Sequence, residues 1–255
     1  MNAEKIYKML CNLDKEFNLE EVHDIIKKNK CSNDFVTDVD RDINTFLEFE
    51  LKEIKNLPVV SEENNVKAKK DYWVIDPIDG TTNLIHGYPS CCISIALVKN
   101  GKVTEGCVFN IFTKEMFVGI KGKGSYLCYS DSTYYKRLNV SKVERLGDSL
   151  LGFGFPYDRF KAHALLQIIE RLICECHDLK RMGPASLDIC YVACGRLDGY
   201  YELDLNEWDY QAARLILEEA GGKLTNQFNE DPDDKCNILA TNGLIHEEMR
   251  KKVLW

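Results

Sequence analysis

The chain has 255 residues, 45% of them hydrophobic and 29% charged, which is typical of a globular protein with a substantial core. Its net charge of −8 argues against binding nucleic acid through backbone phosphates, because such proteins carry a basic surface. An odd number of cysteines, eleven, argues against a disulfide framework, and no segment shows a secretory signal or the roughly 20 apolar residues of a membrane helix. We therefore expect a cytoplasmic protein that binds neither nucleic acid nor membranes.

The first half of the chain predicts helices followed by a largely antiparallel sheet. Apolar residues recur at helical spacing over residues 2–29, and a second helix is expected over about residues 39–55. Strand-like runs come next, at residues 58–60, 72–75, 93–98, 103–109 and 115–120. Residues 99–102 predict a hairpin turn, and the glycines of residues 119–124 indicate a second hairpin, not a dinucleotide-binding loop.

The second half predicts an α/β arrangement. Residues 129–149 are polar and are expected to form a loop that marks a boundary. Beyond it, strands and helices alternate, at residues 150–153, 159–174, 178–181, 184–193, 197–202 and 208–220, before a terminal strand and helix. We expect two subdomains, 1–148 and 149–255, within one structural unit.

The most informative segment is Trp-Val-Ile-Asp-Pro-Ile-Asp-Gly-Thr-Thr-Asn, residues 73–83. Pro77 favours extended geometry for the preceding residue, so Asp76 is predicted to end a strand, with Asp79 three residues later. Two carboxylates and the intervening backbone carbonyl are ligands that Mg²⁺ prefers. Gly80 and the N–H groups that follow it open a short helix, where an anion such as phosphate can bind. An Asp-rich turn with a helix-capping aspartate gives the same short pattern.

Other acidic residues occupy turns and helix entries that can converge on this segment. Glu62 and Glu63 follow a predicted strand, Asp40 is expected at the mouth of the second helix, and Asp209 begins a helix seven residues after Glu202. Each also has a plain explanation: a solvated acidic turn for the glutamate pair, and a helix N-cap for each aspartate. Their joint occurrence with the central segment favours a functional site.

The motifs resemble those of the inositol monophosphatase family, which comprises magnesium-dependent, lithium-sensitive phosphatases of inositol phosphate metabolism. The matching fragments occur in the family's order and span nearly the whole chain: residues 33–40, 61–63, 73–83, 207–209 and 218–222. The resemblance implies a layered α-β-α-β-α sandwich of the inositol monophosphatase and fructose bisphosphatase type, paired as a homodimer.

The resemblance also implies roles for individual residues. One Mg²⁺ would bind Glu62, Asp76 and the Ile78 carbonyl, a second would bind Asp76, Asp79 and Asp209, and a third, weaker ion is typical near Glu62. Glu62, with Thr81 hydrogen-bonded to Asp40, would activate the attacking water. The implied substrate contacts are Glu62, Ile78, Asp79, Gly80, Thr81, Thr82, Gly183, Pro184, Ala185, Glu202 and Asp209. Lys30 matches a basic position on a loop of the family.

The favoured activity is hydrolysis of myo-inositol 1-phosphate to myo-inositol and phosphate. The same architecture also serves fructose-1,6-bisphosphatases and nucleotide 3′-phosphatases, and a non-catalytic, partner-binding protein on this fold is a further alternative. Residues 81–83, Thr-Thr-Asn, favour the inositol phosphate and sugar bisphosphate branches. Pro184 departs from the small residue of the alcohol-binding segment, and this leaves the identity of the alcohol open.

Overall fold

The structure, a computed structural model, describes residues 2–18, 33–64, 66–129, 135–156, 158–233 and 235–254. Its helices are α1 (Asn2–Phe17), α3 (Asn33–Ile54), α4 (Thr81–His86), α5 (Ala162–Ile173), α6 (Ala185–Ala193), α7 (Glu207–Glu219) and α8 (His246–Val253). The first sheet contains β1 (Val59–Ser61), β2 (Tyr72–Asp79), β3 (Cys92–Lys99), β4 (Lys102–Asn110), β5 (Glu115–Ile120), β6 (Gly124–Tyr129) and β7 (Tyr135–Arg137). The second contains β8 (Leu150–Phe153), β9 (Asp178–Lys180), β10 (Gly199–Asn206), β11 (Lys223–Thr225) and β12 (Lys235–Thr241).

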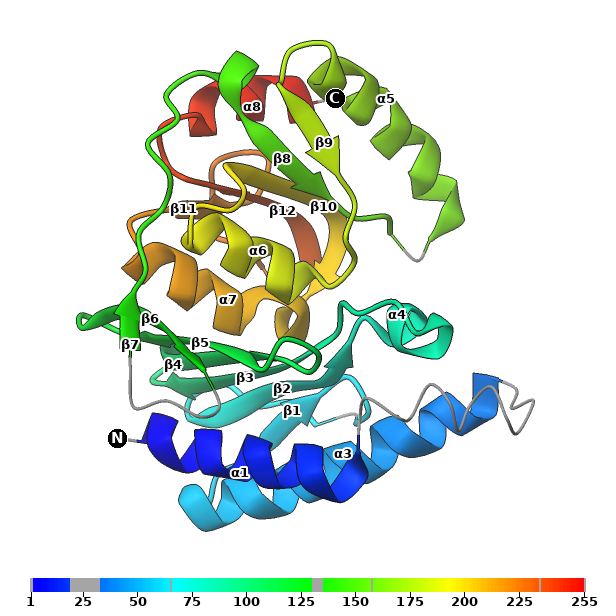
Figure 1. Ribbon diagram of the computed structural model, residues 1–255, viewed down its shortest axis with the longest axis vertical. Helices are drawn as coiled ribbons and strands as arrows, with labels where there is room; N and C mark the ends of the chain where they lie inside the picture. The colour runs from blue at the N-terminus through cyan, green and yellow to red at the C-terminus, as the bar shows by residue number, and fades with distance from the viewer. Residues whose placement is uncertain are drawn as a thin grey trace.

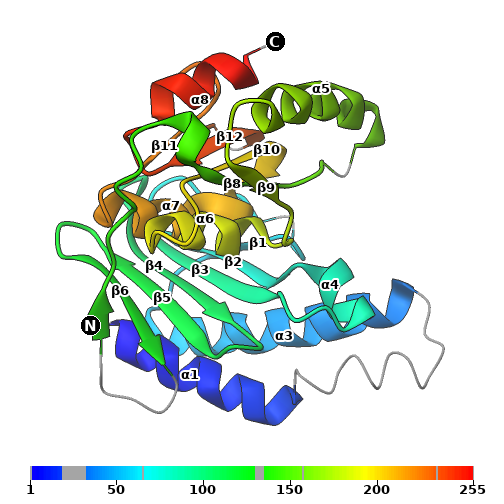
Figure 2. The same ribbon diagram turned by 45° about the horizontal axis from the view of Figure 1, so that its top comes forward.

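These elements form five layers (Figure 1). Helices α1 and α3 cover the outer face of the first sheet, α6 and α7 lie between the two sheets, and α5 and α8 cover the second sheet; the turned view agrees (Figure 2). The expected α-β-α-β-α sandwich is therefore confirmed. None of the described helices is long and apolar enough to cross a bilayer.

The outer layer forms because α3 carries an apolar stripe at helical spacing. Ile43, Leu47 and Leu51 recur every fourth residue and are fully buried. They share a core cluster with Leu10 and Leu13 of α1 and with the apolar side chains on one face of the first sheet. Burial of each such side chain stabilises the fold by roughly 1.5–3 kcal/mol.

The middle layer positions the functional site. Helix α7 packs across β2, β3, β4, β5 and β6 and also contacts the second sheet. Its close approach requires glycine at position 106 of β4, since a Cβ atom there would lie 2.5 Å from the Ala212 carbonyl oxygen. The two sheets are thereby held at a fixed spacing on opposite sides of α6 and α7.

The sheet topology follows the predictions with some corrections. In the first sheet only the β1–β2 pair is parallel, as expected for a largely antiparallel half. The second sheet is mixed, with parallel pairs between β8 and β9 and between β8 and β10. The prediction of a loop across residues 129–149 was wrong in part, because β7 lies within it and pairs with β6.

Two helix boundaries also differ from the predictions. Helix α1 ends at Phe17, and the rest of the predicted helix, with Lys30, lies outside the described residues. Helix α3 begins at Asn33, so Asp40 lies inside the helix and is not its N-cap. The apolar pattern began at Val39, but Asn33 and Asp34 provide the helix start.

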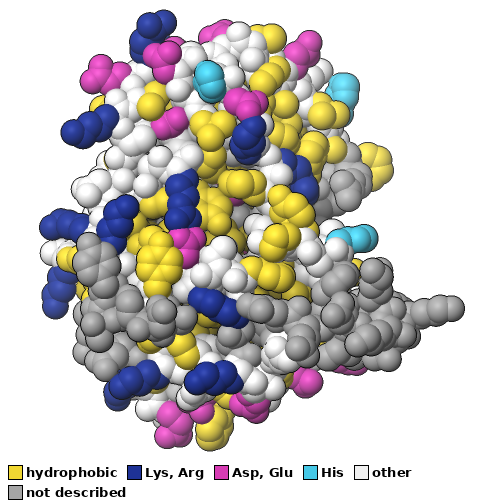
Figure 3. Space-filling model, in the orientation of Figure 1, with side chains coloured by type: hydrophobic (Ala, Val, Ile, Leu, Met, Phe, Trp, Pro, Cys, Tyr) yellow, Lys and Arg dark blue, Asp and Glu magenta, His cyan; other side chains and the backbone are white. Residues whose placement is uncertain are grey.

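In the space-filling view of the face seen in Figure 1, hydrophobic side chains gather in the middle, while charged side chains lie mostly toward the periphery (Figure 3).

Candidate active site

A β-bulge in strand β2 brings the two central aspartates to one face of the first sheet. Asp76 lies opposite Ser94, and Asp79 lies opposite Cys92, so three residues of β2 span two residues of β3. Without the extra residue, side chains three apart would point to opposite faces. Pro77 is tolerated at the bulge because it needs no ladder donor there. The prediction that Asp76 ends the strand was wrong, since the strand continues to Asp79.

The bulge directs both carboxylates toward the middle layer. Asp76 is buried, and its Oδ1 accepts a 3.0 Å hydrogen bond from the Ile78 N–H. Asp79 Oδ2 accepts a 2.9 Å hydrogen bond from the N–H of Ser186, in the first turn of α6. The Ser186 hydroxyl in turn donates to the Asp209 carbonyl oxygen at 2.8 Å. Ser186 thus connects the central segment to α7, a role that the sequence pattern did not indicate.

Asp209 lies at the start of α7, as predicted. Its Oδ2 accepts the Asn206 N–H at 2.7 Å as part of a capping box. The capping explanation and the functional one are compatible here, because the bond occupies one of two carboxylate oxygens. The other oxygen is available to a ligand, and Asp209 lines the pocket described below.

Glu62 and Asp40 approach the same region from other elements. Glu62 follows β1 and keeps exposed surface, whereas Asp40 is buried on α3 and its Oδ1 has no hydrogen-bond partner among the described residues. The expected bond between Thr81 and Asp40 is absent, because the Thr81 hydroxyl donates to the Ile78 carbonyl oxygen at 3.0 Å. That local bond is available as soon as the turn forms, so it competes with the longer-range one.

The acidic groups raise one another's pKa values. Burial, followed by the charges of Glu63 and Glu62, raises the pKa of Asp40 to about 7. Burial, followed by Asp209 and Glu63, raises the pKa of Glu62 to about 7. For Asp209, burial and then the charge of Asp79 raise the pKa to about 7, against the hydrogen bonds from Asn206.

The two aspartates of the bulge show the same effect. Burial raises the pKa of Asp79 to about 6, although hydrogen bonds from Ser186 oppose the shift. Burial and then the charge of Asp79 raise the pKa of Asp76 well above its usual range. These acids therefore oppose one another's ionisation, and at Asp209 the charge of Lys235 offsets only part of this effect.

The acidic side chains are chemically suited to bind divalent metal ions, but the described residues do not hold three of them close enough together to form a metal site. Among the described residues, no group of three His, Cys, Asp or Glu side chains stands ready to hold a metal ion. The oxygen donors nevertheless have the hardness that Mg²⁺ prefers, and their mutual repulsion and the orphaned Asp40 oxygen are both relieved by a cation. A bound cation would draw these mutually repelling carboxylates together.

The turn after β2 is fastened to the segment that precedes α6. Gly80 caps the six-residue helix α4 in the left-handed region, with φ of 95°, and a Cβ atom there would lie 2.8 Å from the Pro184 Cγ. Asn83 Nδ2 donates to the carbonyl oxygens of Ser90 at 2.9 Å and Met182 at 3.1 Å. Asn83 is therefore a positioning residue that the site prediction left out.

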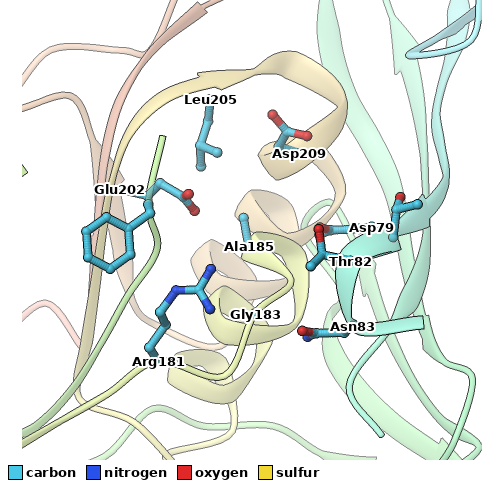
Figure 4. Close-up of a pocket in the computed structure, with 12 residues that line it drawn as sticks. Asp79, Thr82, Asn83, Arg181, Gly183, Ala185, Glu202, Leu205 and Asp209 are labelled. Carbon is cyan, nitrogen blue, oxygen red and sulfur yellow. The ribbon is translucent and has the colours of Figure 1, made fainter. Parts of the chain in front are cut away.

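A pocket opens in front of this turn (Figure 4). It encloses about 610 Å³ of space, including its open mouth. Its lining residues are Asp79, Gly80, Thr81, Thr82, Asn83, Phe155, Arg181, Gly183, Ala185, Glu202, Leu205 and Asp209.

The pocket brings together most of the predicted substrate contacts. Glu62 and Ile78 are not in its lining, and Pro184 is buried beside Gly80 without lining it. Glu202 is buried and accepts a hydrogen bond from the Tyr200 hydroxyl. Burial raises its pKa well above the usual range.

The sequence reasoning missed the pocket's Phe155, Arg181 and Leu205. The arginine had a usable signal, a cation two residues before Gly183. The two apolar residues look like any other core positions in the sequence.

Comparison with known proteins identifies relatives that cover most of the chain. A Nus factor SuhB from Xylella fastidiosa is 35% identical over 246 residues, which cover 92% of this chain and 86% of that protein. An inositol-1-monophosphatase from Synechocystis is 36% identical over 239 residues, 90% and 79% of the two chains. The structure of an inositol monophosphatase from Anabaena superposes with a TM-score of 0.77 at 30% identity and covers 95% of this chain and 96% of that one. The family profile matches residues 3–254, and the chain belongs to the inositol monophosphatase family.

Proposed function

We propose that this protein is a magnesium-dependent phosphate monoester hydrolase whose favoured substrate is myo-inositol 1-phosphate. The observation that supports this most directly is the bulge, which turns Asp76 and Asp79 toward the middle layer that carries Asp209. A structural role does not require so many buried acids that raise one another's pKa values.

The metal ligands are proposed as the resemblance implied. Glu62, Asp76 and the Ile78 carbonyl would hold one ion, and Asp76, Asp79 and Asp209 a second, with a third, weaker ion near Glu62. When bound, the ions neutralise the phosphate charge and lower the pKa of water. The Ile78 carbonyl already accepts the Thr81 hydroxyl but retains a second lone pair.

The chain's own groups position water and phosphate. Glu62, which directly follows β1, would take a proton from the attacking water. Asp40 Oδ1 has no described partner and can accept a hydrogen bond from that water. The N–H groups of Thr81 and Thr82 begin α4 and lack intrahelical acceptors, so they can donate to phosphate oxygens. Thr81 would therefore bind phosphate through its backbone N–H, while its hydroxyl fixes the position of the Ile78 carbonyl.

The alcohol would lie against Gly183, Ala185 and Glu202, which line the pocket beside the phosphate turn. Glu202, whose raised pKa favours the protonated form, can hydrogen-bond a substrate hydroxyl. Asp209 would hold the water that protonates the leaving oxygen.

The variant Asp79→Asn tests the proposal. Phosphate release from myo-inositol 1-phosphate with Mg²⁺ should fall at least about 10³-fold, because a metal ligand is lost. Asp148→Asn, which neutralises an exposed acid in a remote 3₁₀ turn, should leave release unchanged. Near-normal turnover in Asp79→Asn would refute the scheme.

A substrate panel tests the favoured substrate against fructose 1,6-bisphosphate and a nucleoside 3′-phosphate under the same conditions. Highest kcat/KM for inositol phosphate is expected. Absence of Mg²⁺ binding by calorimetry would instead favour a non-catalytic, partner-binding role, which the SuhB-named relatives keep open.

We further propose a cytoplasmic homodimer in which residues 1–148 and 149–255 form subdomains of one unit. Large apolar side chains such as Phe160, Leu166 and Ile173 are exposed, which suits a subunit contact. A monomer mass by light scattering at micromolar concentration would contradict the dimer.

A further inference from the structure

Two glycines in and just after strand β8 lie beside two large side chains of β10. Tyr200 pairs with Gly152 in the parallel ladder between these strands. The Gly154 N–H donates to the Tyr201 carbonyl oxygen at 3.3 Å, which continues the pairing one residue beyond the ladder. Since side chains alternate along a strand, Gly152 and Gly154 face the same side of the second sheet as Tyr200 and Glu202.

The missing side chain at position 154 leaves the space that the Glu202 carboxyl group occupies. A Cβ atom at Gly154 would overlap the carboxyl carbon and both carboxyl oxygens of Glu202. At Gly152, by comparison, a Cβ atom would lie 3.1 Å from the Tyr200 ring. The backbone of Gly154 does not have a positive φ, so its conformation does not require glycine. The need for glycine at this position therefore comes from the space taken by Glu202.

Other neighbours hold the Glu202 carboxyl group in the same place. The buried Tyr200 hydroxyl donates to one of its oxygens, and the residue is only 8% exposed. The other oxygen is available to a ligand, because the bond from Tyr200 occupies only one of the two. The carboxyl group points into the pocket toward Ala185, in the segment proposed to meet the alcohol (Figure 4). Gly154 itself does not line the pocket.

We infer that Gly154 is a positioning residue that sets specificity: it leaves room for the Glu202 carboxyl group, so that the pocket selects phosphate esters of polyhydroxy alcohols over esters whose alcohol has no free hydroxyl. The inference rests on the proposed hydrolase function. A side chain at position 154 would force Glu202 into another rotamer, away from the Tyr200 hydroxyl and from the substrate hydroxyl that it would bind. Gly154 therefore acts only through Glu202.

The test compares myo-inositol 1-phosphate with phenyl phosphate, whose alcohol has no further hydroxyl, using the full-length protein and Mg²⁺. The readout is the ratio of kcat/KM for phosphate release from the two compounds. The wild type should favour inositol phosphate, and Gly154→Ala should lower the ratio about tenfold or more, mainly through a higher KM for inositol phosphate. Gly147→Ala is the matched control, because a Cβ atom there lies no closer than 3.6 Å to its nearest neighbour, and it should keep the wild-type ratio.

A double variant separates positioning from general damage to the fold. Glu202→Ala removes the carboxyl group, so adding Gly154→Ala to it should change the ratio by less than about twofold. Tyr200→Phe keeps the ring and removes only the hydroxyl that donates to Glu202, so it should lower the ratio in the same direction. If Gly154→Ala does not fold, an unchanged ratio in Tyr200→Phe overturns the inference.

The outcomes separate the two proposals. Hydrolysis with a ratio that Gly154→Ala leaves unchanged, or lowers equally in the Glu202→Ala background, overturns the inference and leaves the hydrolase function standing. A wild type that does not favour inositol phosphate has the same consequence. If neither compound is hydrolysed, the hydrolase proposal fails, and titration calorimetry with myo-inositol 1-phosphate and Mg²⁺ decides the role of Gly154. An affinity about tenfold weaker in Gly154→Ala but unchanged in Gly147→Ala supports that role, whereas equal affinities or no binding to the wild type refute it.

Discussion

Buried polar side chains beside the two sheets differ in whether the fold supplies hydrogen-bond partners for them. Next to the first sheet, Asp40 and Asp76 are buried among other acids, and one Asp40 oxygen has no described partner. Between the second sheet and α8, buried His246 is fully satisfied: Thr225 Oγ1 lies 3.1 Å from its Nε2, and Thr241 Oγ1 lies 2.8 Å from its Nδ1. The first region leaves a buried polar atom without a described partner, whereas the second supplies a partner for each ring nitrogen.

The two regions respond to pH in opposite directions. The acids have folded pKa values above their unfolded ones, so without metal their contribution to stability declines as pH rises from about 4 to 7. Burial lowers the pKa of His246 to about 4, below its unfolded value of about 6.5, so its contribution is full above pH 6.5 and is lost as pH falls toward 4. Buried polar groups therefore stabilise only where the fold supplies their partners.

The largest effect is expected from a variant that removes a carboxylate from the acidic region beside the first sheet. In Asp76→Asn, kcat/KM for inositol phosphate should fall about 10³-fold or more, equivalent to roughly 4 kcal/mol. The melting temperature without metal should rise, because repulsion with Asp79 disappears while the bond from the Ile78 N–H is kept. Asp71→Asn, at an exposed position before the same strand, is the control for both kinetics and calorimetry. A lower metal-free melting temperature in Asp76→Asn would show that the acids do not repel.

A smaller effect is expected from His246→Gln. Urea unfolding at pH 7.5 should show a loss of roughly 2–3 kcal/mol, and the difference from wild type should shrink at pH 4.5, where the wild-type advantage is largely lost. His163→Gln, on the exposed face of α5, should change neither value. A difference that is independent of pH would contradict a lowered pKa for His246.

The smallest effect is expected in the pH dependence of Mg²⁺ binding to the acidic region. Acids with pKa values of about 6 to 7 must release protons when Mg²⁺ binds, so affinity should increase about tenfold or more from pH 6 to pH 8. Titration calorimetry in two buffers of different ionisation enthalpy counts the protons released. No proton release in this range would contradict the raised pKa values.

Much of the fold and the family could be predicted from the sequence, whereas several details of the candidate site could not. The order of elements followed from the spacing of apolar residues along the chain. The family followed from residues 73–83 and the later Trp-Asp pair, because those residue types serve one chemistry. The bulge was hidden, since residues 73–75 are apolar without alternation and give no register. The bond from Thr81 to the Ile78 carbonyl and the orientation of Arg181 depend on tertiary contacts that no spacing encodes.

The contact between Gly80 and Pro184 bears on how the pocket could be re-engineered. The turn after β2 and the segment that precedes α6 are about a hundred residues apart in the chain, yet they pack together and are linked by Asn83. A substitution at either residue is expected to shift both segments. Phe155, Arg181 and Leu205 line the pocket and are not among the atoms nearest to a Cβ at Gly80, so directed evolution toward new ligands should find its productive substitutions there first.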